Sequence, residues 1–375
     1  MKNNNTIVRF MQRYMCGDIV TWSAIILLSI FGLLTSYSSC SSLVYRRLNN
    51  NFVPFFIKHL INTVFGLYIV WMVHRIDYIH FASLSKVGVV VSVITLIISW
   101  RYGVNINGAS RWIKVPYINL TFQPSDFAQL SLVVYLPYSI SILNGHKPNN
   151  DKSMLIVIFL ICGLVSLTKF SKAVLLFTLC MIMMFIGKYP LKKLVSLSAY
   201  IIICVCMVAL CFGQRRQTII NRLRNFSTNY ELPYQTHKAF NAISNGGIYG
   251  IGPGNSTQRF FLPYSHSDYV YPIIIEEYGV IVGIIIIIIY LTLVYRGIVT
   301  AKNKNCDTFA KLLCISLTLN VAMQAIANIG VTLGLLPPTG IQLPLISTGG
   351  TSMIFTCVCF GIILSVQRRV QANQL

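Results

Sequence analysis

Asp268 is the acidic residue of this 375-residue chain whose surroundings best suit chemistry. It lies in the run LPYSHSDYVYP at residues 262–272, and Pro272 is suited to the first turn of a helix. A carboxylate here stands beside a helix N-terminus, where a polar loop meets an apolar run. There it can accept a proton from a hydroxyl group as a general base, or it can only cap the helix. The spacing alone leaves both roles open.

Glu276 and Glu277 follow Asp268 inside the apolar run that begins at Pro272. A charge inside a membrane helix costs roughly 2.5–3.5 kcal/mol at its middle and less near its end. Eight residues of helix rise about 12 Å, so Glu276 cannot act with Asp268 as a directly paired acid and base. We expect both glutamates to be structural, paired with a cation of the outer side or hydrogen-bonded between helices.

Asp126 follows Gln123, Pro124 and Ser125 and is predicted to stand in the first turn of a helix. An anion is favourable near the positive end of the helix dipole, and Ser125 can cap the same turn. The favoured role of Asp126 is therefore capping. The change Asp126→Asn is expected to cost much less activity than the same change at Asp268.

Arginines and lysines in two polar segments suggest an anionic ligand. Arg111 and Lys114 lie in the first segment and Arg259 lies in the second. A guanidinium group binds phosphate through a bidentate fork, so these cations suit a phosphorylated lipid. A general attraction to anionic lipid head groups is the alternative explanation. Further cations of the second segment are Arg215, Arg216, Arg222, Arg224 and Lys238.

The glycine-rich run GGIYGIGPG at residues 246–254 superficially resembles a dinucleotide-binding loop. That motif requires a preceding strand and a following helix in a βαβ unit, and neither is predicted here. A close backbone turn at the membrane surface explains these glycines better.

The composition of the whole chain indicates a membrane protein. Hydrophobic residues make up 55% and charged residues 10%, against about 45–50% and 25% in globular proteins. The formal net charge of +21 does not indicate nucleic-acid binding, because the cations are scattered between long apolar runs. The 11 cysteines include no CxxC pair, which argues against a zinc site or a disulfide framework.

Apolar runs long enough to cross a membrane occur throughout the chain. We therefore predict an all-α polytopic membrane protein, a single domain over residues 1–375. Little more than Phe170 and Ser171 separates the fifth and sixth spans, which predicts a tight helical hairpin. The ten predicted spans lie near 19–37, 56–74, 84–100, 126–143, 154–169, 172–187, 194–213, 272–295, 309–332 and 349–367.

The distribution of lysine and arginine predicts the orientation of these spans. With the N-terminus in the cytoplasm, the inner segments carry 16 of these residues and the outer segments 14. Setting aside the long loop at about 214–271, which counts weakly in this rule, leaves 16 against 8. Both termini are thus predicted to be cytoplasmic, with that long extracytoplasmic loop between the seventh and eighth spans. Residues 1–18 show no cleavable signal pattern, so the first span is expected to remain as an anchor.

Four ordered stretches resemble the SEDS family of polytopic cell-wall polymerases, which includes FtsW and RodA. The resemblance covers nearly the whole chain and agrees with ten spans. The start, GDIVTW at 17–22 and YSSCSS at 37–42, is more similar to the division members than to the elongation members. The four stretches are NGASRW at 107–112 with FQPSD at 122–126, NGGIYGIGPGNSTQ at 245–258 with Leu262, Pro263, His266 and Asp268, EEYG at 276–279, and residues 328–350, which end in LLPPTGIQLPLISTGG.

The resemblance implies a glycosyltransferase that acts on lipid II, a disaccharide-pentapeptide carried on undecaprenyl diphosphate. The acceptor's GlcNAc 4-hydroxyl would join the donor's MurNAc C1, with inversion and loss of the lipid diphosphate. Asp268 is then the expected general base, and a divalent cation, Mg²⁺ or Mn²⁺, can help to neutralise the diphosphate. The residues expected to bind the substrate are Arg111, Trp112, Lys114, Gln258, Arg259, His266 and Ser347.

The resemblance also implies a location and partners. The expected location is the bacterial cytoplasmic membrane at the division septum. The expected partner is a class B penicillin-binding protein, a single-span transpeptidase, together with other division proteins. Its docking site is expected in a lipid-facing groove near the eighth and ninth spans, where small residues permit close helix approach. These small residues are Ala322, Ala325, Ala327 and Gly330.

The chain departs from the family pattern inside the predicted membrane region. Many members have a lysine in QPSExxK and an aspartate in QPDLGT, which can pair. Here Gln129 and Lys169 occupy these positions, so that ion pair is lost. Tyr264 replaces the glutamate of the family's PEAHTD stretch, which removes an acid near the expected base.

Two other functions share these features. A lipid II flippase would carry the same substrate through a basic cavity, and transporters often show internal repeats and broken helices near the midplane. No repeat is visible in this sequence, and the distinctive residues gather at the predicted outer face. The second alternative is an inactive scaffold of the wall-synthesis complex. The lost Lys–Asp pair favours a scaffold weakly, and the presence of Asp268 argues against it.

Overall fold

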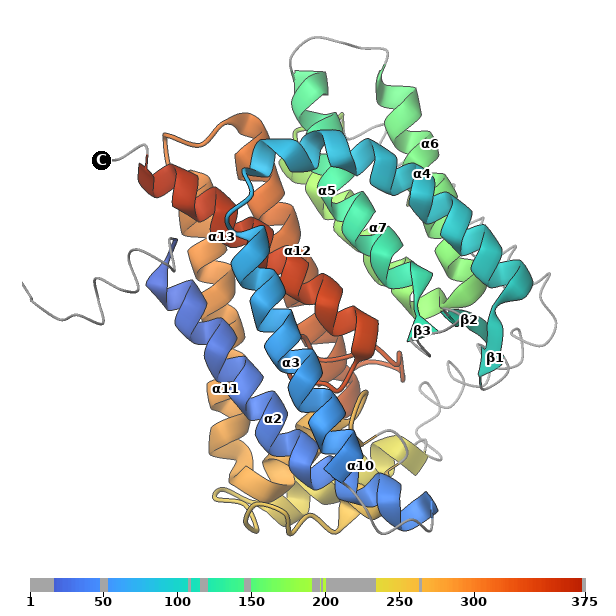
Figure 1. Cartoon of the computed structure of the whole chain (residues 1–375), viewed down its shortest axis with the longest axis vertical. Helices are drawn as coiled ribbons and strands as arrows, with labels where there is room; N and C mark the ends of the chain where they lie inside the picture. Colours follow the sequence, from blue (N-terminus) through green and yellow to red (C-terminus); the bar gives the residue numbers. More distant parts are fainter. Residues whose placement is uncertain are drawn as a thin grey trace, which may run out of the picture.

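Apolar helices that lie side by side form most of the structure, which is a computed structural model (Figure 1). It describes residues 17–47, 53–106, 109–114, 121–144, 150–190, 196, 198–199, 234–262 and 265–372. Nine of the ten predicted spans coincide with helices, and the span predicted at 194–213 lies almost entirely outside the described residues. These nine helices are α2 (Ile19–Arg47), α3 (Val53–Val73), α4 (Tyr78–Tyr102), α5 (Pro124–Asn144), α6 (Asn150–Thr168), α7 (Phe170–Ile186), α11 (Val270–Lys302), α12 (Thr308–Thr332) and α13 (Gly350–Ala372).

The helical membrane fold predicted from the sequence is confirmed. Among the described residues, seven helices are long and apolar enough to span a membrane, whereas α6 and α7 are shorter apolar helices. Only Lys169 separates α6 from α7, which confirms the predicted tight hairpin. Side chains from α5, α7, α12 and α13 fill the core, and those of Leu136, Leu176, Leu317 and Phe360 are fully or almost fully buried.

A few short elements of another kind interrupt the helices. The strands β1 (Val104–Ile106), β2 (Ala109–Lys114) and β3 (Thr121–Phe122) pair antiparallel in the order β1-β2-β3. Helix α10 (Tyr234–Gly246) and the 3-10 turn η1 (Gln258–Phe260) precede α11. The strands are short and pair only with one another, so hydropathy alone does not predict them.

Contacts between charged groups join the segments predicted to be cytoplasmic. Asp18, just before α2, forms an ion pair with Arg296 near the end of α11. Asp77, between α3 and α4, pairs with Arg368 at 2.9 Å near the end of α13. The sheet, α10 and the glycine-rich run lie at the opposite end of the bundle (Figure 1). The described segments therefore alternate between the two ends as predicted, while the orientation in the membrane remains a prediction.

The orientation can be tested by the accessibility of single cysteines in intact cells. A cysteine at Lys302 or Lys192 should be shielded from a membrane-impermeant thiol reagent, because both positions are predicted to be cytoplasmic. A cysteine at Gln258 or Arg222 should react. Labelling in the reverse pattern would contradict the predicted orientation and, with it, an extracytoplasmic reaction.

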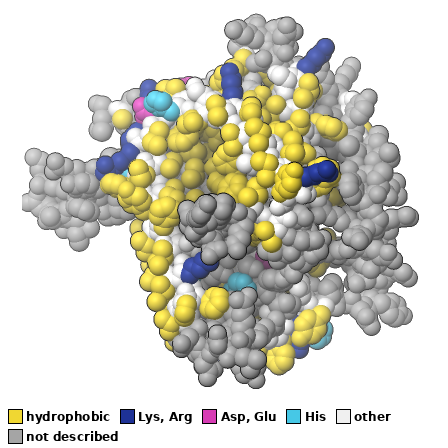
Figure 2. All heavy atoms as spheres, turned by 45° about the vertical axis from the view of Figure 1, so that its right-hand side comes forward, with side chains coloured by type: hydrophobic (Ala, Val, Ile, Leu, Met, Phe, Trp, Pro, Cys, Tyr) yellow, Lys and Arg dark blue, Asp and Glu magenta, His cyan; other side chains and the backbone are white. Residues whose placement is uncertain are grey.

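The surface of the bundle is largely hydrophobic, as a lipid environment requires. Figure 2 shows a broad hydrophobic face with lysine and arginine side chains at its edges. On α4, large hydrophobic side chains are exposed along the helix, including Leu84, Val87, Val90 and Ile94. Such a surface is stable in hydrocarbon and would be an aggregation hazard in water.

The small residues of α12 do not form the expected lipid-facing groove. Ala325 and Ala327 are only 3% and 7% exposed within this chain. A Cβ at Gly330 would contact Leu336 of the same chain at 3.0 Å, and Ala322 lines a small internal space together with Tyr290. These residues permit close packing of α12 inside the bundle, so the reasoning that placed a partner on them was wrong.

Candidate active site

Helix α11 is broken at Gly279, where φ is 85° and ψ is 168°. The backbone of the glycine-rich run fills this break. Ile251 N–H donates to Glu276 O at 2.9 Å, Gly252 N–H donates to Glu277 O at 3.0 Å, and Val280 N–H donates to Gly247 O at 3.0 Å. The break therefore leaves few backbone groups without partners. This arrangement confirms the interpretation of the glycine run as a close backbone turn.

Glycine is required where the two backbones meet. A Cβ at Gly279 would lie 2.1 Å from Ile248 O, and a Cβ at Gly246 would lie 2.1 Å from Ile275 O. At Gly250 the distance to Glu277 O would be 2.3 Å. These neighbours are backbone atoms, which cannot move aside as a flexible side chain can.

Changing Gly279 to alanine should therefore destabilise the protein by about 2 kcal/mol or more, through overlap and an unfavourable positive φ. The matched control is Gly163→Ala in α6, where a Cβ would meet nothing within 4 Å and alanine favours the helix. Thermal unfolding of both variants in detergent is the measurement. Equal melting temperatures for the two variants would contradict the close approach of the backbones.

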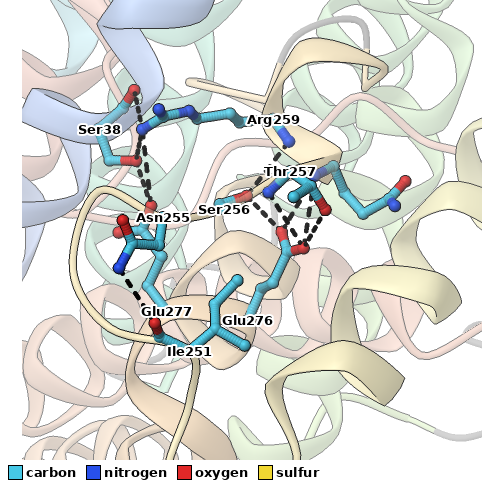
Figure 3. A network of polar contacts seen from close by, with 9 residues as sticks. Ser38, Ile251, Asn255, Ser256, Thr257, Arg259, Glu276 and Glu277 are labelled. Atoms are coloured by element: carbon cyan, nitrogen blue, oxygen red, sulfur yellow. Dashed lines mark hydrogen bonds and ion pairs between the residues drawn. The ribbon is translucent and has the colours of Figure 1, made fainter.

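The Glu276 carboxylate organises the end of the glycine-rich run (Figure 3). It is fully buried and accepts hydrogen bonds from Ser256 Oγ, from Thr257 Oγ1 at 3.1 Å and from Gln258 N–H at 3.3 Å. Asn245 Nδ2 also donates to it, at 3.4 Å. Glu276 thus fixes the backbone at the start of η1, as a residue with the predicted structural role would do.

Glu277 pairs with the cation of Arg259, which is one of the two arrangements expected for this glutamate. Arg259 Nη1 lies 4.0 Å from Glu277 Oε1 and donates to Ser38 Oγ at 2.8 Å, while Ser38 Oγ donates to Glu277 (Figure 3). The Arg259 guanidinium also lies over the Phe260 ring, 4.8 Å from its centroid. This cluster ties α2 to α11 and to η1. The Arg259 charge therefore has a buried counter-charge, and its role toward a substrate remains a prediction.

The segment that carries Asp268 is pinned to the loop between α12 and α13. Thr348 N–H and Thr348 Oγ1 both donate to His266 O, at 3.0 and 2.7 Å. Ser347 Oγ donates to Ser267 O and accepts from Leu343 N–H. Asn328 Nδ2 donates to Asp268 O at 2.9 Å. Two of the stretches that resemble the family, the one with His266 and Asp268 and the one at 328–350, thus build one site. Ser347, which was expected to bind substrate, supports the backbone of this site.

The Asp268 side chain is half-buried and lies against Gly340. A Cβ at Gly340 would be 3.2 Å from Asp268 Oδ2 and 3.9 Å from Lys169 Cε. The Lys169 ammonium group donates to Gly340 O. Burial lowers the pKa of His266, and the charge of Asp268 offsets this only in part, so the imidazole is neutral at pH 7. Asp268 stands two residues before α11, as predicted.

A buried ion pair that the sequence did not reveal lies between α5 and α7. Asp126 and Lys172 form it, with side chains 6% and 12% exposed. The first-turn position of Asp126 is confirmed, but its carboxylate pairs across helices, so the capping prediction missed its main partner. Gln129 Nε2 donates to Asn320 Oδ1, and Lys169 donates to Gly340 O. The residues at the family's Lys–Asp positions, Gln129 and Lys169, have other partners here. A different ion pair, Asp126–Lys172, joins α5 to α7.

The remaining predicted residues are only partly described. Arg111, Trp112 and Lys114 lie on β2, and Trp112 is half-buried, whereas the side chains of Arg111 and Lys114 are outside the described part. Arg215, Arg216, Arg222, Arg224 and Tyr264 lie outside the described residues altogether. Within the described ranges, no three His, Cys, Asp or Glu side chains gather as a metal centre would require.

The chain folds into apolar helices that can cross a membrane, and loops at one end of the bundle bring carboxylates and cations together. These features define a polytopic membrane protein with a site at one surface. The family described as cell cycle protein, which groups FtsW, RodA and SpoVE, matches residues 18–372. The chain belongs to this family, so the resemblance to SEDS proteins is confirmed.

Relatives of similar length carry the name probable peptidoglycan glycosyltransferase FtsW. The protein of Coxiella burnetii is 28% identical over 92% of this chain and 95% of its own length. The protein of Bacillus subtilis is 30% identical over 94% of this chain and 90% of its own length. The similarity to the division members agrees with these names.

Solved structures share the fold. A chain from a study of the structural coordination of polymerization and crosslinking by a peptidoglycan synthase complex has a TM-score of 0.72 and 20% identity. The alignment covers 94% of this chain and 98% of that chain. The rod shape determining protein RodA of Thermus thermophilus has a TM-score of 0.66 and 19% identity, over 95% and 98% of the two chains.

Proposed function

We propose that this chain polymerises lipid II at the outer face of the membrane, with Asp268 as the general base. The chain is a peptidoglycan glycosyltransferase of the FtsW kind, which is the activity named for its relatives. The observation that carries the proposal is the position of Asp268, half-buried on a pinned segment directly before α11. A carboxylate held in this way can accept a proton without first reorganising its surroundings.

The proposed transfer uses the site as follows. The 4-hydroxyl oxygen of the acceptor sugar attacks C1 of the donor sugar, and its proton passes to Asp268. The bond between C1 and the phosphate oxygen breaks, and the electron pair leaves with the lipid diphosphate. The hydrogen bonds from Asn328 and Ser347 hold the backbone of Ser267 and Asp268 in place during this step.

A divalent cation remains part of the proposal. Mg²⁺ is usually held by one or two protein carboxylates together with substrate phosphates. Among the described residues, Asp268 supplies the carboxylate that lies at the proposed site. A single carboxylate is compatible with an ion that arrives bound to the diphosphate of the substrate. When bound, the ion would stabilise the charge of the leaving group.

The proposed partner is a class B penicillin-binding protein at the division septum of the bacterial cytoplasmic membrane, with other division proteins. A structural neighbour of this chain comes from a peptidoglycan synthase complex. The apolar surface near α11 and α12 remains the proposed docking region, now through exposed side chains. These include Ile284, Ile288 and Ile326, which are 50%, 54% and 65% exposed.

A flippase is the second candidate, because α11 is broken at Gly279 and broken helices are typical of transporters. In transporters such breaks lie near the midplane. Here the break is at the tenth residue of a 33-residue helix, toward the end that carries the sheet and α10. Its groups also bond to the glycine run, so the break builds a surface loop and favours the polymerase.

The deciding experiment supplies lipid II to the purified protein with its partner and follows glycan chains by gel electrophoresis. The polymerase proposal expects chains that require the protein. Transfer of labelled lipid II across vesicles without any polymer would instead support the flippase. Neither product, with normal assembly of the partner complex, would support the scaffold.

A further inference from the structure

Lys169 lies beside Asp268, although the two residues come from distant parts of the sequence. Both Asp268 Oδ2 and Lys169 Cε lie within 4 Å of the position that a Gly340 Cβ would occupy. Gly340 has a φ of 65° and no side chain, which allows both groups to approach its backbone. The hydrogen bond from Lys169 Nζ to Gly340 O fixes the ammonium group on this side of the loop.

The setting of Lys169 differs from that of two other described cations at this end, Arg259 and Lys172. Arg259 lies beside the buried carboxylate of Glu277, and Lys172 pairs with that of Asp126. Lys169 instead has the proposed base, Asp268, as the nearby carboxylate. It stands at the N-cap of α7, outside the helical turns, and is half-buried. A substrate that reaches Asp268 therefore also meets the Lys169 ammonium group.

We infer that Lys169 is a substrate-contacting residue of the Asp268 site, whose ammonium group binds the diphosphate that joins the donor sugar to its lipid. The inference rests on the proposed function for the identity of this ligand. An ammonium group has three donors and forms strong charge-assisted bonds to phosphate oxygens. In the transfer, the acceptor oxygen bonds to C1 and gives its proton to Asp268. The C1–O bond to phosphate breaks, and Lys169 offsets the negative charge left on that oxygen.

This role also explains a feature of the sequence. Many family members have an aspartate where this chain has Lys169, and a lysine where it has Gln129. Gln129 donates to Asn320 here, so no lysine at that position needs a partner at 169. The Asp126–Lys172 pair joins α5 to α7 in its place.

Binding to the purified full-length chain in nanodiscs tests the inference without requiring turnover. The probes are undecaprenyl diphosphate and undecaprenol, which lacks phosphate. Lys169→Gln should weaken binding of the diphosphate by about 10–100-fold, the effect of losing a charged hydrogen bond. It should leave undecaprenol binding unchanged. Lys169→Arg should restore most of the affinity, because the charge is kept.

The matched control is Lys152→Gln, the same change at an exposed lysine near the start of α6, at the other end of the bundle. It should bind both probes as the wild type does. Unchanged diphosphate binding in Lys169→Gln would overturn the inference, and so would an equal loss for both probes, which would indicate a merely structural role. Free pyrophosphate as a competitor should act on the wild type and lose its effect in Lys169→Gln.

The inference and the proposed function fail separately. A normal polymerisation rate in Asp268→Asn would contradict the proposed base and leave the binding result valid. If the base is confirmed, Lys169→Gln should also lower kcat/KM for lipid II by about 10–100-fold. A wild-type kcat/KM in that variant would count against Lys169 alone.

Discussion

Replacing Asp268 by asparagine is expected to slow glycan polymerisation by about 10²–10⁴-fold, which corresponds to roughly 2.7–5.5 kcal/mol of barrier. Asparagine keeps the size of the side chain and most of its hydrogen bonding, but it cannot accept a proton. The fold should survive, because the bond from Asn328 is made to the Asp268 backbone carbonyl. Lipid II binding should survive because asparagine keeps the size of the side chain and most of its hydrogen bonding. The measurement is the rate of polymer formation with the partner present, at matched protein concentration.

The matched control is Asp307→Asn, which makes the same chemical change at an exposed residue. Asp307 accepts a hydrogen bond from Tyr78 at the opposite end of the bundle. Its replacement should leave the polymerisation rate unchanged. A normal rate in Asp268→Asn together with an inactive Asp126→Asn would reverse the assignment and move the base to the start of α5.

The helices could be predicted from the sequence because a membrane span has a simple physical signature. About 20 apolar residues are enough to satisfy the backbone within one helix and to match the hydrocarbon thickness. The break of α11 at Gly279 lacks such a signature. It depends on hydrogen bonds from Ile251 and Gly252, which precede it by more than 20 residues. Only the glycines on both sides, Gly250 and Gly279, hint at the close approach.

The candidate site was predicted in part. Asp268 and Glu277 could be selected because acids are rare in this chain and each sits beside or within an apolar run. Ser347 supports the backbone of Ser267, and the substrate contact expected for it remains a prediction. The partners of Lys169 and Asp126 could not be predicted, because they depend on how α5, α7 and the loop before α13 pack together. Spacing along one helix carries no information on such contacts.

The second large expected effect is a loss of protein stability when the Asp126–Lys172 ion pair is broken. Both side chains are almost completely buried. Removing one partner of a buried pair typically costs 3–5 kcal/mol, since the remaining charge stays in the interior without compensation. Asp126→Asn should therefore lower the free energy of unfolding by about 3–5 kcal/mol. The loss should appear as a lower melting temperature in detergent and a lower yield of folded protein.

Two comparisons distinguish this effect from capping and from catalysis. Asp126→Asn/Lys172→Met removes the stranded charge as well, so it should recover most of the lost stability. A capping role would predict no such recovery and a loss nearer 1 kcal/mol. Asp77→Asn, the same change in an exposed pair whose aspartate is 44% exposed, should cost about 1 kcal/mol or less.

Per folded molecule, Asp126→Asn should polymerise lipid II at close to the wild-type rate, because Lys172 and Asp126 only hold α5 against α7. A variant that folds as stably as the wild type but makes no polymer would place Asp126 in the reaction itself.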